Sequence, residues 1–164
     1  MTTTPFANSQ PLRRRTLLAT GAGLLLAAHL PAWSQGPLLE VWKDPDCGCC
    51  KDWVSHLEAN GFRVKVNDTG NEAMRKRLGV AAKYGSCHTG LVAGYAIEGH
   101  VPAREIARLL KERPGAIGLA VAGMPVGSPG MDGKVYGDRQ DAYEVLLLTR
   151  EGGATVYQRY PGKA

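Results

Sequence analysis

Apolar and polar residues follow two different periods along residues 38–66, and the change of period predicts separate elements. Within residues 47–60 apolar side chains recur at i, i+3, i+4 and i+7, which is the spacing of one helix face. Residues 62–66 alternate apolar and polar side chains, as a half-buried strand does. Residues 38–42 form a short apolar run, a predicted strand, which the turn sequence Asp44-Pro45-Asp46 ends. The helical stripe consists of Cys50, Trp53, Val54 and Leu57.

The pattern continues with a short helix predicted over residues 72–78 and a strand over residues 91–97. Pro102 opens a third helix, because proline is favoured at the first helical position, and Pro114-Gly115 ends it. The inner face of this helix carries Ile106, Leu109 and Leu110.

Residues 116–143 are rich in glycine and proline and contain one short apolar run, residues 117–121. Residues 144–149 and 154–160 then predict a β-hairpin. The whole pattern predicts one α/β domain with a mixed central sheet flanked by helices, followed by the Gly/Pro-rich loop and the hairpin. Because a strand followed by cysteines at a helix start is the thioredoxin-like arrangement, we expect a thioredoxin-like domain over residues 35–164.

The start of the chain has the pattern of an export signal. Arg13-Arg14-Arg15 precede an apolar stretch, Leu17 to Leu30, that is short for a membrane span, and Ala32-Trp33-Ser34 offers a cleavage site. We therefore expect residues 1–34 to be a cleavable signal peptide and the mature protein to be periplasmic. Arg14 to Leu18 also suits a twin-arginine signal, so the Sec and Tat routes both stay open. An uncleaved anchor is a third alternative.

Removal of the leader changes the charge of the protein. The chain has 20 Lys+Arg and 15 Asp+Glu, and the leader holds three arginines and no acid, so the mature part keeps 17 basic against 15 acidic residues. This near balance gives no support to a nucleic-acid partner. We expect no stable membrane anchor after cleavage. The chain also lacks a phosphate-binding glycine loop, an H-E-x-x-H motif and a nucleophile elbow.

Three cysteines stand within four positions at the predicted start of the first helix, in Cys47-Gly48-Cys49-Cys50. A helix N-terminus favours thiolate over thiol, which serves metal binding and disulfide exchange equally. The spacing of Cys47 and Cys50 fits a thiol–disulfide oxidoreductase, which needs two sulfurs. Cys49 is superfluous there, whereas a soft metal such as Cu(I) benefits from further thiolates. A structural framework of two disulfides is the third alternative for an exported chain.

A second group of candidate ligands lies later in the chain. Cys87-His88 precedes the predicted strand at 91–97, in the loop that would face the cysteine-bearing helix. Met124 and Met131 lie on the Gly/Pro-rich loop, without a periodic packing pattern, and could fold over the cysteines as soft ligands. The plainer alternatives are a buried Cys87, a solvated His88 and methionines that fill gaps. We expect His56 and His100 at the surface.

These motifs resemble the CopG-type copper-resistance proteins of the bacterial periplasm. The resemblance covers residues 39–160 and is most specific over Lys43 to Trp53. Family-like blocks also occur at Ser86–Thr89, Glu98–Pro102 and Gly123–Met131. The resemblance implies a thioredoxin-like fold, a C-x-C-C copper site and a role in copper handling.

Carried over by position, the resemblance implies copper ligation by Cys47, Cys49, Cys50 and Cys87, with His88, Met124 and Met131 as further candidates. The sequence hypothesis is therefore a periplasmic protein that sequesters Cu(I), several ions included, through a cysteine cluster, with redox or electron-transfer activity open. Its partners would be copper ions and other periplasmic copper-handling proteins. The alternative is a thiol–disulfide oxidoreductase acting on exported proteins.

Overall fold

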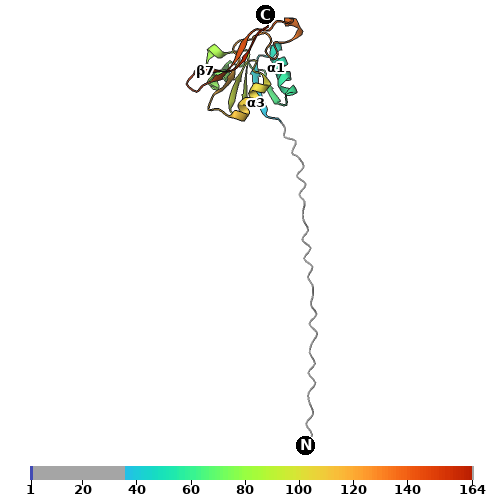
Figure 1. Ribbon diagram of the computed structural model, residues 1–164, viewed down its shortest axis with the longest axis vertical. Coiled ribbons are helices and arrows are strands. Elements are labelled where there is room, and N and C mark those ends of the chain that lie inside the picture. The colour runs from blue at the N-terminus through green and yellow to red at the C-terminus, as the bar shows by residue number, and fades with distance from the viewer. Residues whose placement is uncertain (2–35, 164) are drawn as a thin grey trace. The chain divides into compact units, whose positions relative to one another are not determined.

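The structure is a computed structural model that describes Met1 and residues 36–163 (Figure 1). The predicted leader, apart from Met1, lies outside the described residues. Within the described part, no helix is both long enough and apolar enough to cross a membrane.

Seven strands and three α-helices make up the described domain, with two short 3-10 helices (Figure 1). Their bounds are β1 (Leu38–Lys43), α1 (Gly48–Ala59), β2 (Arg63–Asn67), α2 (Glu72–Arg77), η1 (Ala82–Tyr84), β3 (His88–Val92), β4 (Tyr95–Glu98), α3 (Ala103–Glu112), β5 (Gly118–Ala120), η2 (Lys134–Tyr136), β6 (Tyr143–Leu148) and β7 (Ala154–Tyr160).

All the strands join one sheet in the order β2-β1-β3-β4-β5-β6-β7. The pairs β1–β2 and β4–β5 are parallel, and the other neighbours are antiparallel. The predicted mixed α/β architecture is therefore confirmed. The strand expected over residues 91–97 was wrong as one element, because Ala93 and Gly94 both take positive φ and turn the chain back between β3 and β4.

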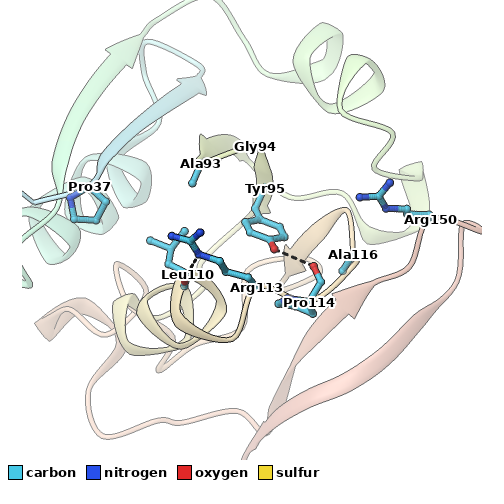
Figure 2. A pocket seen from close by; sticks show the side chains of 9 residues that line it. All are labelled: Pro37, Ala93, Gly94, Tyr95, Leu110, Arg113, Pro114, Ala116 and Arg150. Carbon is cyan, nitrogen blue, oxygen red and sulfur yellow. Dashed lines mark hydrogen bonds between the residues drawn. The ribbon is translucent and has the colours of Figure 1, made fainter.

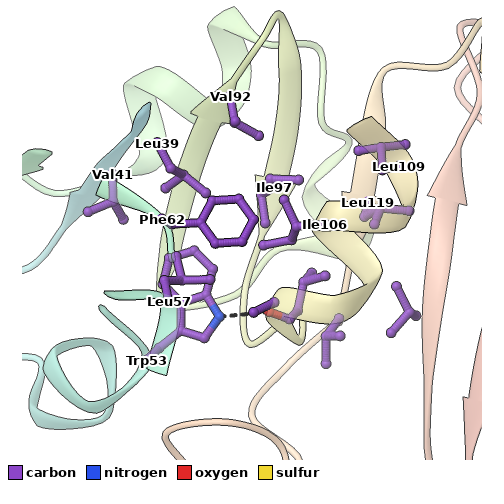
Figure 3. Close-up of a cluster of buried hydrophobic side chains, with 14 residues drawn as sticks. Leu39, Val41, Trp53, Leu57, Phe62, Val92, Ile97, Ile106, Leu109 and Leu119 are labelled. Atoms are coloured by element: carbon purple, nitrogen blue, oxygen red, sulfur yellow. Dashed lines mark hydrogen bonds between the residues drawn. The ribbon is translucent and has the colours of Figure 1, made fainter. Parts of the chain in front are cut away.

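Two helices bury their apolar stripes in the same core. Trp53 and Leu57 of α1 and Ile106 and Leu109 of α3 are all fully buried in one cluster with side chains of β1 and β4, as Figure 3 shows. The Trp53 indole N–H donates to the carbonyl of Val101 at 2.9 Å. This bond ties the helix that carries the cysteines to the turn before α3.

A smaller cluster lies under the segment that follows α2. Val80, Ala96, Ala120 and Leu148 are buried together there. In β4 and β5 neighbouring residues join different clusters, since Ile97 belongs to the first and Ala96 to the second. Because side chains alternate between the two faces of a strand, the central sheet is covered on both faces.

Candidate metal centre

The turn between β1 and α1 is fixed by a buried lysine. Lys43 is 2% exposed, and its ammonium contacts the Asp68 carboxylate at 2.6 Å and donates to the Asp44 carbonyl at 2.8 Å. The Cys47 N–H donates to the same Asp44 carbonyl at 3.2 Å. Cys47 takes the N-cap position of α1, so the motif sits at the helix start as predicted.

Sulfur atoms from two distant stretches converge beside this helix start. Cys87 Sγ lies 3.5 Å from Cys50 Sγ and 3.9 Å from Cys49 Sγ, and Cys49 Sγ lies 3.6 Å from Cys47 Sγ. The four sulfurs lie within 4.8 Å of one another. The expectation that Cys87 faces the cysteine-bearing helix is therefore confirmed.

Cys47 and Cys50 are joined in a disulfide, whereas Cys49 and Cys87 are free thiols. The alternative of two structural disulfides was therefore wrong. A disulfide between residues three apart leaves the other two sulfurs beside it, where they can exchange with it or bind metal. Cys50 is fully buried, and the other three cysteines are partly exposed.

His100 belongs to the same site, and its expected place at the surface was wrong. The ring is fully buried, with Nε2 3.1 Å from Cys87 Sγ and Nδ1 2.8 Å from the Pro129 carbonyl. Because a carbonyl can only accept, Nδ1 carries the proton and the neutral ring presents its Nε2 lone pair toward the thiol. A histidine held in this way by a backbone carbonyl is typical of metal ligands.

His88 is also fully buried, which excludes the solvated alternative. Its Nδ1 lies 3.4 Å from Cys87 Sγ, and its ring packs on Trp53 with centroids 4.1 Å apart. Its Nε2 has no hydrogen-bond partner among the described residues. A buried ring nitrogen is usually hydrogen-bonded, and ligation by His88 stays a prediction. Cys87, His88 and His100 form a second group with metal-ligand spacing.

Burial sets the protonation of these groups. It raises the pKa of the Cys87 thiol to about 12, with a further contribution from Cys49. Burial also lowers the pKa of His100, and it lowers that of His88 well below the usual range. The two imidazoles are therefore neutral near pH 7, which is the form that binds a metal.

The Gly/Pro-rich loop reaches the site through its backbone. Gly130 packs so closely on α1 that a Cβ there would lie 2.6 Å from the Cys49 carbonyl. Met131, next to it, is 7% exposed, and its sulfur accepts a hydrogen bond from the Tyr136 hydroxyl. Met124 is 53% exposed. The loop thus covers the helix start, while ligation by either methionine stays a prediction.

A cavity of about 630 Å³ lies elsewhere and is lined by neither cysteine nor histidine. Figure 2 shows its residues, among them Tyr95, whose hydroxyl donates to the Pro114 carbonyl at 2.9 Å. Leu110 and Arg113 of the α3 region form one wall. This cavity is therefore separate from the sulfur–imidazole site.

The protein is therefore a mixed α/β protein with four sulfurs and two imidazoles gathered at the start of one helix. These donors make a candidate centre for a soft metal. The solved structure of copper resistance protein CopG, form 2, is 53% identical, covers 77% of this chain and 99% of its own, and has a TM-score of 0.71. Form 1 is 54% identical over 76% of this chain and 98% of its own, with the same TM-score of 0.71.

The chain belongs to the CopG family of copper resistance proteins. Residues 84–131 also match a family described as "Protein of unknown function, DUF411". No curated protein sequence matches the chain. The matched segment includes Cys87, both buried histidines and the two loop methionines, but it begins after the C-x-C-C motif.

Proposed function

We propose that this protein is a periplasmic copper-binding protein that sequesters Cu(I) in copper resistance. The observation that carries the proposal is the convergence of four cysteine sulfurs, from segments 37 residues apart, with two neutral imidazoles beside them. Thiolates and imidazoles are the donors that suit Cu(I), and adjacent cysteines suit several ions that share sulfurs better than one tetrahedral zinc. Copper is here the cargo of the protein.

The disulfide gives the site two states. Reduction of the Cys47–Cys50 bond takes two electrons and two protons and yields two thiols, so that the reduced site offers four sulfurs. In the disulfide form only Cys49 and Cys87 remain as thiols. We infer that copper capacity follows this redox state, and that electron transfer between copper and the thiols is open to the reduced site.

Metal retention tests the proposal directly. The full chain, reduced without oxygen and mixed with Cu(I), should keep more than one copper per chain on a desalting column. Cys49→Ser should keep less, because one sulfur between the two segments is lost, and the disulfide form should keep less than the reduced form. Retention of no copper by the reduced wild type would discard the proposal.

A thiol–disulfide oxidoreductase is the second candidate, favoured by the disulfide at the N-terminus of α1. The strand order β2-β1-β3-β4, with a helix after β1 and after β4, supports a thioredoxin-like label for the domain. Metal-free reduction of insulin that survives Cys49→Ser and Cys87→Ser would favour this function. Its loss in either variant would favour the copper site.

The periplasmic location rests on the N-terminal pattern alone. N-terminal sequencing of protein from the periplasmic fraction should find a start near residue 35. A protein that starts there has lost the apolar stretch of the leader and therefore has no stable anchor. Other periplasmic copper-handling proteins are the partners that such a location offers, and nucleic acid is not among them.

A further inference from the structure

The backbone of Ser86, the residue just before Cys87, is held through both its N–H and its carbonyl. The Ser86 N–H donates to Glu98 Oε1 at 2.7 Å. The Ser86 carbonyl accepts from Arg75 Nη2 at 2.6 Å and Asn71 Nδ2 at 3.2 Å. Ser86 precedes β3, so side chains rather than a strand partner fix the backbone from which the Cys87 thiol projects.

Glu98 also reaches the other side of Cys87. Its Oε2 accepts from the Thr89 hydroxyl at 2.6 Å, and Oε1 accepts from Arg75 Nε at 2.8 Å. The carboxylate is fully buried and both of its oxygens are used. One side chain therefore bonds the residue before Cys87 and the second residue after it.

Stability alone does not account for this glutamate. Burying a carboxylate costs free energy that its ion pair often fails to return, and an apolar residue of similar size is frequently as stable. The donors on Glu98 instead include two from the Cys87 segment, Ser86 N–H and the Thr89 hydroxyl.

The turn that carries His100 interlocks with the same segment. The Gly99 N–H donates to the His88 carbonyl at 3.0 Å. Gly99 has φ +70°, and a Cβ there would lie 2.6 Å from Ser86 Cβ. The residue next to Glu98 therefore packs against the residue next to Cys87, so a shift of Glu98 would move both the thiol and the imidazole that follows.

We propose that Glu98 is a positioning residue that, through Ser86 and Thr89, holds Cys87 Sγ within reach of Cys50 and His100 and so sets the geometry of the metal centre. Its effect on copper rests on the proposed function, whereas its effect on the thiol is measurable without metal.

Glu98→Gln keeps the size of the side chain and removes the charge that holds the donors. In the metal-free disulfide form, alkylation of Cys87, followed by peptide mass spectrometry with Cys49 as internal reference, should become about tenfold faster, as for loss of one charge-assisted hydrogen bond. In the reduced form with Cu(I), the ultraviolet sulfur-to-copper band should shift or weaken. Unchanged labelling in the folded variant would overturn the proposal.

Glu105→Gln is the matched control. Glu105 is also buried, at 4% exposure, and bonds Arg104 and Tyr160 away from the cysteines. Glu105→Gln should lose stability as Glu98→Gln does, but its Cys87 should not be labelled faster. Equal acceleration of Cys87 labelling in both variants would overturn the proposal.

Thr89→Val, which removes the hydroxyl that donates to Glu98 and keeps the shape of the side chain, replaces Glu98→Gln if that variant does not fold. This variant should accelerate the labelling of Cys87 about threefold, which is less than Glu98→Gln does because only one hydrogen bond to the carboxylate is lost. An unchanged rate overturns the proposal. A wild type that binds no copper refutes the copper function alone, because the labelling result still decides the role of Glu98.

Discussion

The Nε2 atom of His100 lies 3.1 Å from the sulfur of Cys87, although the two residues are 13 positions apart. The other ring nitrogen donates to the Pro129 carbonyl, so the backbone of the Gly/Pro-rich loop fixes both the orientation and the tautomer of the ring. His100 thus joins the turn before α3 to the residue that precedes β3, Cys87, and to the Gly/Pro-rich loop.

His100→Gln should weaken Cu(I) binding by at least about tenfold, because loss of a positioned ligand should cost no less than loss of its supporting partner. Competition with a Cu(I) chelator, performed without oxygen, measures this change. His56→Gln is the matched control, since His56 lies on α1 and bonds the Ala103 N–H. Equal affinity of His100→Gln and wild type would remove His100 from the ligand set.

Cys87 should react slowly as a thiol while the Cys47–Cys50 disulfide is intact. Only the thiolate attacks an alkylating agent, and burial raises the pKa of Cys87 to about 12. Its labelling rate should therefore keep rising beyond pH 10, whereas the rate for an ordinary cysteine is half-maximal near about pH 8.5 and levels off by about pH 10. Peptide mass spectrometry after timed labelling measures the rate.

Denatured protein gives the reference labelling rate for Cys87. The protein should take up two labels before reduction, at Cys49 and Cys87, and four after it, when Cys47 and Cys50 are thiols as well. A labelling rate for folded Cys87 that is half-maximal below about pH 9 would contradict the raised pKa of this partly buried thiol.

Local sequence patterns predicted those parts of the site that are formed by elements adjacent in the chain. The apolar stripe with Trp53 and Leu57 predicts that one face of α1 is buried in the core. The start of α1, which carries the cysteines, then lies next to the end of β1. The turn at Ala93 was missed, because a non-glycine residue with positive φ gives little local signal.

The place of His100 depends on contacts that no local period encodes. Its burial requires the carbonyl of Pro129, which comes from a loop without regular spacing, and histidine by itself is more often exposed. The family-like block Glu98–Pro102 was the available signal. The pairing of Glu98 with Arg75 was missed for the same reason, since α2 and β4 meet only in the folded chain.

Acid should destabilise the metal-free protein in part through His56. Burial lowers the pKa of His56 below the model-peptide value of 6.5, although Asp132 opposes the shift, and its Nε2 must be unprotonated to accept from Ala103. The contribution is therefore complete above about pH 6.5 and is lost as the pH falls through the lower, folded pKa. Urea unfolding between pH 5 and 8 measures it.

His56→Gln keeps an acceptor for Ala103 but does not titrate. The free energy of unfolding of this variant should fall less steeply toward pH 5 than that of wild type. The two slopes should differ by at most the slope that the uptake of about one proton on unfolding produces. Some slope should remain, because burial also lowers the pKa values of His88 and His100. His56→Ala should lose about 1 kcal/mol at pH 8, where no histidine is charged, through its missing hydrogen bond. Identical slopes in wild type and His56→Gln would refute this role.

Gly130→Ala should damage both the fold and the metal centre. Gly130 has φ +85°, and a Cβ there would lie 2.6 Å from the Cys49 carbonyl and 2.8 Å from the Trp53 amide nitrogen. Both contacts are with helix backbone, which cannot move aside as a flexible side chain can. The strained φ and the overlap together should cost about 2–4 kcal/mol of unfolding free energy, measured in urea on the metal-free disulfide form.

Gly133→Ala is the matched control on the same loop. Gly133 has φ −69°, and a Cβ there would meet no atom within 4 Å, so its stability should stay within about 0.5–1 kcal/mol of wild type. Because the backbone displaced by Gly130→Ala continues into the Pro129 carbonyl that orients His100, this variant should also hold Cu(I) less tightly, whereas Gly133→Ala should not. A Gly130→Ala protein as stable as Gly133→Ala would show that the loop does not press on the start of α1.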